Sequence, residues 1–179
     1  MGQPSEAERV RGYILSQANK LTIPELVDKV RADTAPLRDA AASVPAARFF
    51  ERPASNDWSA AEVFTHILDM NDRGVGLITG ILDTGTAPAA VVDEMTGETR
   101  AGLESAEAYW QSYLAKREPF LDRVRAARGD EHLEIRVRSS FGDLTWREWL
   151  LFMRVHDLDH MRQLQSLATH FASPAAKST

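Results

Sequence analysis

The chain has 179 residues, of which 44% are hydrophobic and 26% charged, a composition typical of a soluble globular protein. Its net charge of −5 and the absence of long apolar runs exclude a broad basic surface and a membrane span, so we expect no nucleic-acid or membrane partner. The absence of cysteine excludes disulfides, thiolate metal ligands and a cysteine nucleophile. We expect a single domain over residues 1–179, cytoplasmic because the amino-terminal stretch lacks the apolar run of a signal peptide.

Three predicted helix starts share one pattern, in which a hydroxyl residue is followed three positions later by glutamate. The pairs are Thr22 with Glu25, Ser59 with Glu62, and Thr145 with Glu148. In such a capping box each side chain hydrogen-bonds to a backbone amide of the other residue. Apolar residues at three- and four-residue spacing follow each start and predict helices over about 23–43, 59–83 and 145–170.

Other segments complete the expected architecture. A short helix is predicted near 6–18, and a long one runs from about 100–105 to 128. Residues 84–98 are rich in Gly, Pro and Thr and predict a loop, whereas the alternating pattern of 132–138 predicts a short strand or an extended arm. Four long helices predict an all-α four-helix bundle with a short extra N-terminal helix and a core over about 22–170.

Two histidines of the last helix stand out. His156 and His160 are four residues apart, so their side chains lie one turn apart on one face of a helix. They belong to a series with spacings of 4, 3, 4, 3 and 4, typical of a face turned toward a bundle interior. The series is Trp149, Met153, His156, His160, Gln163 and Leu167. His66 lies on the inward side of the helix predicted over 59–83.

Three imidazole rings at interior positions each need a polar partner, because an unpaired buried polar group costs about 1–3 kcal/mol. Each ring is either a hydrogen-bonded core residue or a ligand of one shared metal ion. Three nitrogen ligands with open positions form a catalytic pattern rather than a structural one. We predict a divalent metal site of His66, His156 and His160 for zinc, nickel, cobalt or ferrous iron, among which imidazole ligands do not discriminate.

Nearby polar residues are candidates for orienting these rings. Asp159 follows His156 by three residues and is the preferred second partner, while Asp157 is expected to be solvated. Glu62 is assigned to the helix cap. Gln163 continues the interior series and either lines a pocket or is a satisfied interior amide.

Two segments carry a family resemblance. The stretch DWSAAEVFTHI, residues 57–67, resembles the second-helix signature of the DinB-like superfamily of damage-inducible bacterial proteins. TWRE at 145–148 and HDLDHMRQ at 156–163 resemble the last helix of that family. The resemblance covers about 22–170 and implies a four-helix bundle of unusual connectivity, commonly dimeric. It also implies a divalent metal held by His66, His156 and His160.

The resemblance also suggests a function, because characterised relatives include transferases that use bacillithiol or mycothiol. Our leading hypothesis is a metal-dependent thiol S-transferase, in which a small-molecule thiol attacks an electrophile. The alternatives are a metal-dependent hydrolase and a non-catalytic metal- or ligand-binding stress protein. A basic cluster beside the metal would favour the transferase, and Arg154 and Arg162 lie on the same predicted helix as two of the ligands.

A homodimer is expected from the resemblance and from the helix over 59–83, which is apolar on more than one face. Its apolar residues are Val63, Phe64, Ile67, Leu68, Met70, Val75, Leu77, Ile78, Ile81 and Leu82.

Overall fold

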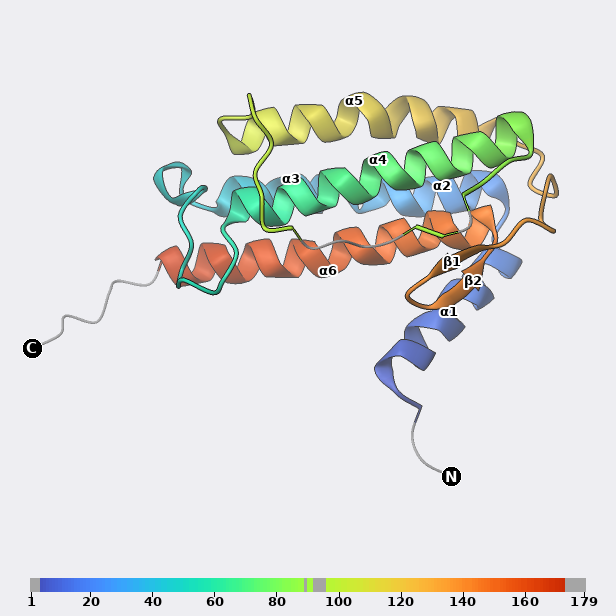
Figure 1. Cartoon of the computed structure of the whole chain (residues 1–179), viewed down its shortest axis with the longest axis horizontal. Coiled ribbons are helices and arrows are strands. Elements are labelled where there is room, and N and C mark those ends of the chain that lie inside the picture. Colours follow the sequence, from blue (N-terminus) through green and yellow to red (C-terminus); the bar gives the residue numbers. More distant parts are fainter. Residues whose placement is uncertain (1–3, 89, 92–95, 173–179) are drawn as a thin grey trace, which may run out of the picture.

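The structure is a computed structural model and describes residues 4–88, 90–91 and 96–172. It is an all-α helical bundle, which confirms the predicted fold class. The helices of the bundle lie side by side (Figure 1). They are α2 (Ile23–Ala32), α3 (Thr34–Ser43), α4 (Ala60–Thr84), α5 (Ala106–Arg125) and α6 (Trp146–Ala172). Helices α2 and α3 lie end to end and together occupy the place of one long helix in the bundle. Helix α1 (Glu6–Lys20) lies at an angle to the bundle, near the strands β1 and β2 described below.

The capping boxes predicted from the sequence form at the starts of the helices. At α4 the Ser59 amide donates to Glu62 at 2.8 Å, and the Glu62 amide donates to the Ser59 hydroxyl at 3.2 Å. Glu62 also forms an ion pair with Arg52 and is buried. Its predicted role as a cap is therefore confirmed. The helix ends at Gly85, whose φ of 63° is the left-handed conformation that glycine adopts without strain.

The prediction of one continuous helix over 23–43 is wrong in one respect, because the chain breaks at Asp33 into two helices, α2 and α3. Pro36 explains the break. Proline has no amide hydrogen to donate to the carbonyl four residues earlier, and its ring would clash with that carbonyl in a continuous helix. The Leu37 amide instead bonds to the Asp33 carbonyl at 3.2 Å, which starts the second helix.

The strand predicted over 132–138 is also displaced. The structure forms a hairpin of β1 (Val137–Ser139) and β2 (Gly142–Leu144), antiparallel, with Val137 opposite Leu144. His132 has a φ of 52°, outside the extended region, so the strand cannot begin there. The extended conformation is stable only where β2 supplies backbone partners.

The long helix predicted to end near 128 and the loop predicted over 84–98 largely agree with the structure. Helix α5 begins after Ser105, whose hydroxyl accepts from the Ala108 amide at 3.1 Å, and it ends at Arg125 rather than near 128. The predicted loop over 84–98 starts after α4, and Ala90 forms a bridge with Arg138. Residues 89 and 92–95 of that loop lie outside the described part of the chain.

Helix α4 is at the centre of the bundle and packs against both α5 and α6. Gly74 permits the close approach of α6, because a Cβ at this position would overlap the side chain of Met153. Most of the apolar residues of α4 are buried within one chain. Their distribution over several faces therefore no longer argues for a dimer. Among the described residues, no helix is long and apolar enough to cross a lipid bilayer.

Candidate metal centre

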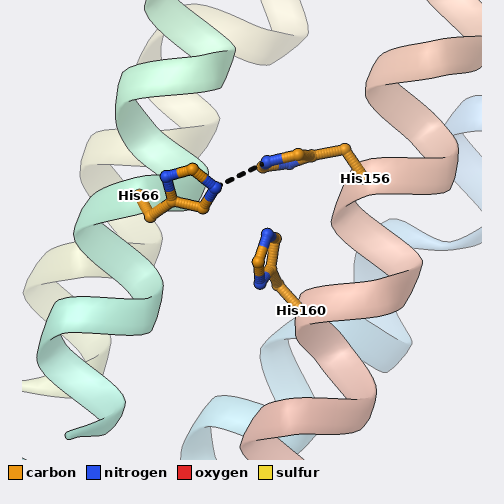
Figure 2. Close-up of side chains that lie close together, drawn as sticks. All are labelled: His66, His156 and His160. Carbon is orange, nitrogen blue, oxygen red and sulfur yellow. Dashed lines mark hydrogen bonds between the residues drawn. The ribbon is translucent and has the colours of Figure 1, made fainter. Parts of the chain in front are cut away.

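The structure brings His66, His156 and His160 together. His66 comes from α4, and the other two come from successive turns of α6 (Figure 2). All three are buried, with 5%, 8% and 8% of their surfaces exposed. The Nε2 atoms of His66 and His156 are 3.0 Å apart, and His160 points a ring nitrogen toward the gap between them. One potential ligand atom from each ring lies within 4.8 Å of those of the others.

The donor set fits a divalent ion. Imidazole nitrogens that share a tetrahedral ion at 2.0–2.1 Å lie about 3.3 Å from one another. The His66–His156 separation is close to that value. In the hydrogen bond between the two Nε2 atoms one ring donates and the other accepts, so at least one of these atoms directs its lone pair into the space between the rings.

The electrostatics of His160 favour the neutral form that a metal requires. Burial, together with the neighbouring His156 and His66 rings, lowers the pKa of His160 to about 4. A neutral imidazole keeps the lone pair that binds a metal. The His160 ring is therefore neutral at pH 7, with a hydrogen on one nitrogen only.

Gln163 selects which nitrogen of His160 is available. The Nδ1 atom of His160 lies 2.7 Å from Oε1 of Gln163, one turn further along α6. Since the amide oxygen only accepts, Nδ1 must carry the hydrogen and Nε2 keeps its lone pair. Gln163 also lines a cavity, which is one of the two options drawn from the sequence, and it is exposed rather than the interior amide of the other option.

Asp159, the predicted orienting residue, is not brought to the ligand rings in this way. Its side chain is 73% exposed, and its carboxylate lies 4.0 Å from Arg162. It exerts a weak charge effect on His160 but makes no hydrogen bond to that ring within the described residues. Its side chain points outward from the helix, and the carboxylate that lies near His156 is that of Asp157.

Asp157 is buried rather than solvated, which corrects the expectation from the sequence. Its Oδ2 atom accepts from the Tyr113 hydroxyl at 2.8 Å and forms an ion pair with the fully buried Arg117. Burial has the largest effect and would raise the pKa of Asp157, but the Arg117 charge together with His156 and the Tyr113 hydrogen bond outweighs it and lowers the pKa. The other carboxylate oxygen lies 3.8 Å from Nδ1 of His156.

This network was missed in the sequence analysis. Tyr113 and Arg117 are four residues apart, so they lie on one face of α5, and the Arg117 guanidinium donates to the Tyr113 hydroxyl at 2.8 Å. The sequence feature that could have revealed this network is Arg117, which lies on a helix face otherwise filled by aromatic and aliphatic residues. It indicates a buried acidic partner on another helix, and the partner is the residue adjacent to a metal-ligand candidate.

The triad lies in the wall of a cavity of about 730 Å³. The cavity extends from the histidines to α1 and to the tip of the hairpin. Of the two arginines considered from the sequence, Arg162 lines this cavity, whereas Arg154 contacts Tyr13 and Asp33. Trp58 borders the triad on another side, its ring centroid 5.6 Å from that of His66.

A helical bundle with three inward histidines on two adjacent helices defines a class of candidate metalloproteins. Comparison with family models identifies the particular family, because residues 26–164 match the model of the DinB superfamily. The chain belongs to the DinB superfamily, as the resemblance of its second and last helices predicted. Comparisons with curated proteins and with solved structures gave no match.

Proposed function

We propose that this protein is a metal-dependent thiol S-transferase in which His66, His156 and His160 hold one divalent ion. A low-molecular-weight thiol is the cosubstrate. The observation that carries the proposal is the position of three buried imidazoles in the wall of a cavity of about 730 Å³. Structural metal sites are closed by four protein ligands, whereas the described residues bring three ligands together beside a cavity large enough for a small organic molecule.

The proposed reaction joins a thiol sulfur to an electrophilic carbon. The S–H proton goes to solvent, the sulfur electron pair forms the new C–S bond, and the leaving group departs with its bonding pair. A divalent ion held by neutral ligands supplies its full charge, which lowers the pKa of a thiol and favours the nucleophilic thiolate. Because the chain has no cysteine, the sulfur must arrive on a cosubstrate.

The residues around the triad support this role. Burial keeps His160 neutral, and the hydrogen bond to Gln163 orients its ring. Arg162, at the border of the same cavity, offers a cation to a carboxylate of the thiol. These groups hold and orient, and none of them is required to exchange a proton with substrate.

Metal content tests the first half of the proposal. His66→Ala, His156→Ala and His160→Ala should each lose most of the bound ion when tag-free protein is loaded and measured by elemental analysis. His170→Ala is the matched control, since His170 is an exposed residue near the end of the same helix. Unchanged metal content in all three triad variants would show that the site is elsewhere.

Turnover tests the second half. The metal-loaded protein is assayed with bacillithiol, mycothiol and glutathione against monochlorobimane, and with simple esters and amides without thiol. Conjugation that needs a thiol and is lost on chelation supports the transferase. Ester or amide cleavage without thiol supports a metal-dependent hydrolase instead, and inactivity across the panel supports a metal- or ligand-binding protein.

A further inference from the structure

The cavity over the triad has a wall that the family match does not include. The match begins at residue 26, whereas α1 spans Glu6–Lys20 and contributes Ala7 and Val10 to the cavity. Phe141, at the turn of the hairpin, continues the same wall. This side of the cavity is therefore built from an element outside the matched region, joined to the β1–β2 turn.

The wall is fixed to the bundle by several contacts. The Arg11 guanidinium of α1 donates to the Phe141 carbonyl at 2.9 Å, which joins the helix to the hairpin. Arg154 of α6 donates to the Tyr13 hydroxyl at 2.9 Å, and Ile14 is fully buried in the core. Because these contacts tie α1 to both neighbours, its cavity-facing residues keep a defined position.

An apolar surface leads from this wall to the histidines. The Phe141 and Phe152 rings pack edge to face with centroids 5.8 Å apart, and the Phe152 centroid is 6.3 Å from that of His156. Val10 and Val155 lie on the same lining. A ligand that reaches the triad from this side would therefore contact carbon over most of its length.

Among the described residues that line the cavity, the charged ones are Glu6, Asp159 and Arg162. Asp159 and Arg162 lie 4.0 Å apart on α6 and are both more than 70% exposed, so water screens their attraction, whereas Glu6 is the charged residue of the described lining on the α1 side. An anionic group placed against α1 would meet this carboxylate. The wall therefore favours an uncharged ligand over an anionic one.

We infer that the surface formed by Val10, Phe141, Phe152 and Val155 binds the uncharged, apolar body of the electrophilic substrate beside the triad. This inference rests on the proposed function, since it assigns one of the two substrates of that reaction to one side of the cavity. The thiol, whose carboxylates need a cation, is left with the side that carries Arg162 and Gln163. The electrophile is thus expected to be an aryl or branched alkyl compound.

Binding of simple metal ligands tests the inference without turnover. The protein is loaded with Co²⁺, and dissociation constants for imidazole, 4-phenylimidazole and 4-(4-carboxyphenyl)imidazole are measured from the visible absorption of the cobalt. Burial of a phenyl group against the wall should make 4-phenylimidazole bind about tenfold or more tightly than imidazole. The carboxylated probe should lose most of that gain.

Two variants locate the effect. Phe141→Ala in the hairpin and Val10→Asp in α1 should each reduce the preference for the phenyl group severalfold, with the affinity for imidazole itself unchanged. Phe50→Ala is the matched control, because Phe50 is exposed and does not line this cavity. Using one variant in each element separates loss of the apolar surface from local unfolding of either element.

The outcomes distinguish this inference from the proposed function. If the protein binds Co²⁺ but shows no preference for the phenyl group, or if neither variant changes it, the apolar subsite is rejected while the metal centre stands. If Co²⁺ does not bind at the triad, the proposed function fails and the inference fails with it.

Discussion

At the scale of single residues, the orientation of the candidate metal ligands depends on neighbouring side chains that are not themselves ligands. Gln163 accepts from Nδ1 of His160, and the buried Asp157 lies beside Nδ1 of His156. Such partners determine the tautomer and the orientation of a ligating imidazole, and they contribute to metal affinity almost as the ligands do. The proposed centre therefore extends from α6 to α5 through Tyr113 and Arg117.

Replacing Gln163 tests this view. Gln163→Leu removes the acceptor for His160 and should weaken metal binding about 10–100-fold, whereas Gln163→Glu retains an acceptor and should keep most of the affinity. Competition with a chromophoric chelator measures both. Gln165→Leu, on the exposed surface of the same helix, is the control and should bind as the parent does. Equal affinities for the Leu variants at both positions would remove Gln163 from the site.

The buried ion pair of Arg117 and Asp157 gives a second prediction. Arg117→Met leaves the Asp157 carboxylate buried without its cation and should lower the free energy of unfolding by about 3–5 kcal/mol. Urea denaturation measures the loss. Arg123→Met, which removes the exposed ion pair with Asp83, should cost no more than about 1 kcal/mol.

The double variant Arg117→Met with Asp157→Leu separates pairing from packing. Removing both charges should recover most of the stability lost in the single variant, because no buried charge remains unpaired. A double variant as unstable as Arg117→Met alone would mean that the arginine contributes through packing.

At the scale of elements, the start of α4 is the clearest link between sequence and site. This helix carries His66 one turn after Glu62, and Glu62 closes the cap with Ser59 and pairs with Arg52. Burial raises the pKa of Glu62, but the hydrogen bonds from Arg52 and Ser59 outweigh it and lower the pKa below its usual 4.5. The ionised carboxylate therefore stabilises the folded state.

The lowered pKa of Glu62 predicts how the stability of the protein depends on pH. A carboxyl group whose pKa is lower in the folded than in the unfolded state contributes stability above the unfolded value, and the contribution is lost as pH falls through the folded value. Glu62→Gln should therefore be less stable than the parent at pH 7 by about 1–2 kcal/mol. The difference should shrink as pH falls below about 4.5.

Thermal or urea unfolding of both proteins between pH 7 and pH 3 measures this convergence. Glu25→Gln is a useful comparison, because Glu25 closes the same kind of cap at α2 but is exposed to solvent. It should show a smaller difference at pH 7. A constant gap between Glu62→Gln and the parent at all pH values would contradict the assignment.

At the scale of the whole molecule, oligomeric state is the open prediction. The apolar faces of α4 are covered by α5 and α6 of the same chain, so the expected homodimer now depends on family resemblance alone. Light scattering at micromolar concentration should give about twice the chain mass of 19.9 kDa. A mass near that of one chain would reject the dimer.

The sequence by itself determined the fold class, most helix starts and the three histidines. These features have local causes: a capping box depends on residues three apart, and a helical face depends on spacings of three and four. His156 and His160 were recognisable as a pair because helix geometry alone places them together. His66 could be added because its helix has an equally clear inward side.

Only the tertiary structure decided what surrounds the triad. Local spacing placed Asp159 near the rings, but packing turned it to solvent and buried Asp157 against Arg117, a residue 40 positions away in the chain. The apolar wall likewise joins α1, the hairpin turn and α6. The spacing of residues within a single helix indicates which of its faces turns inward, but contacts between helices also depend on how each helix is shifted along and tilted against its neighbours, which that spacing does not encode.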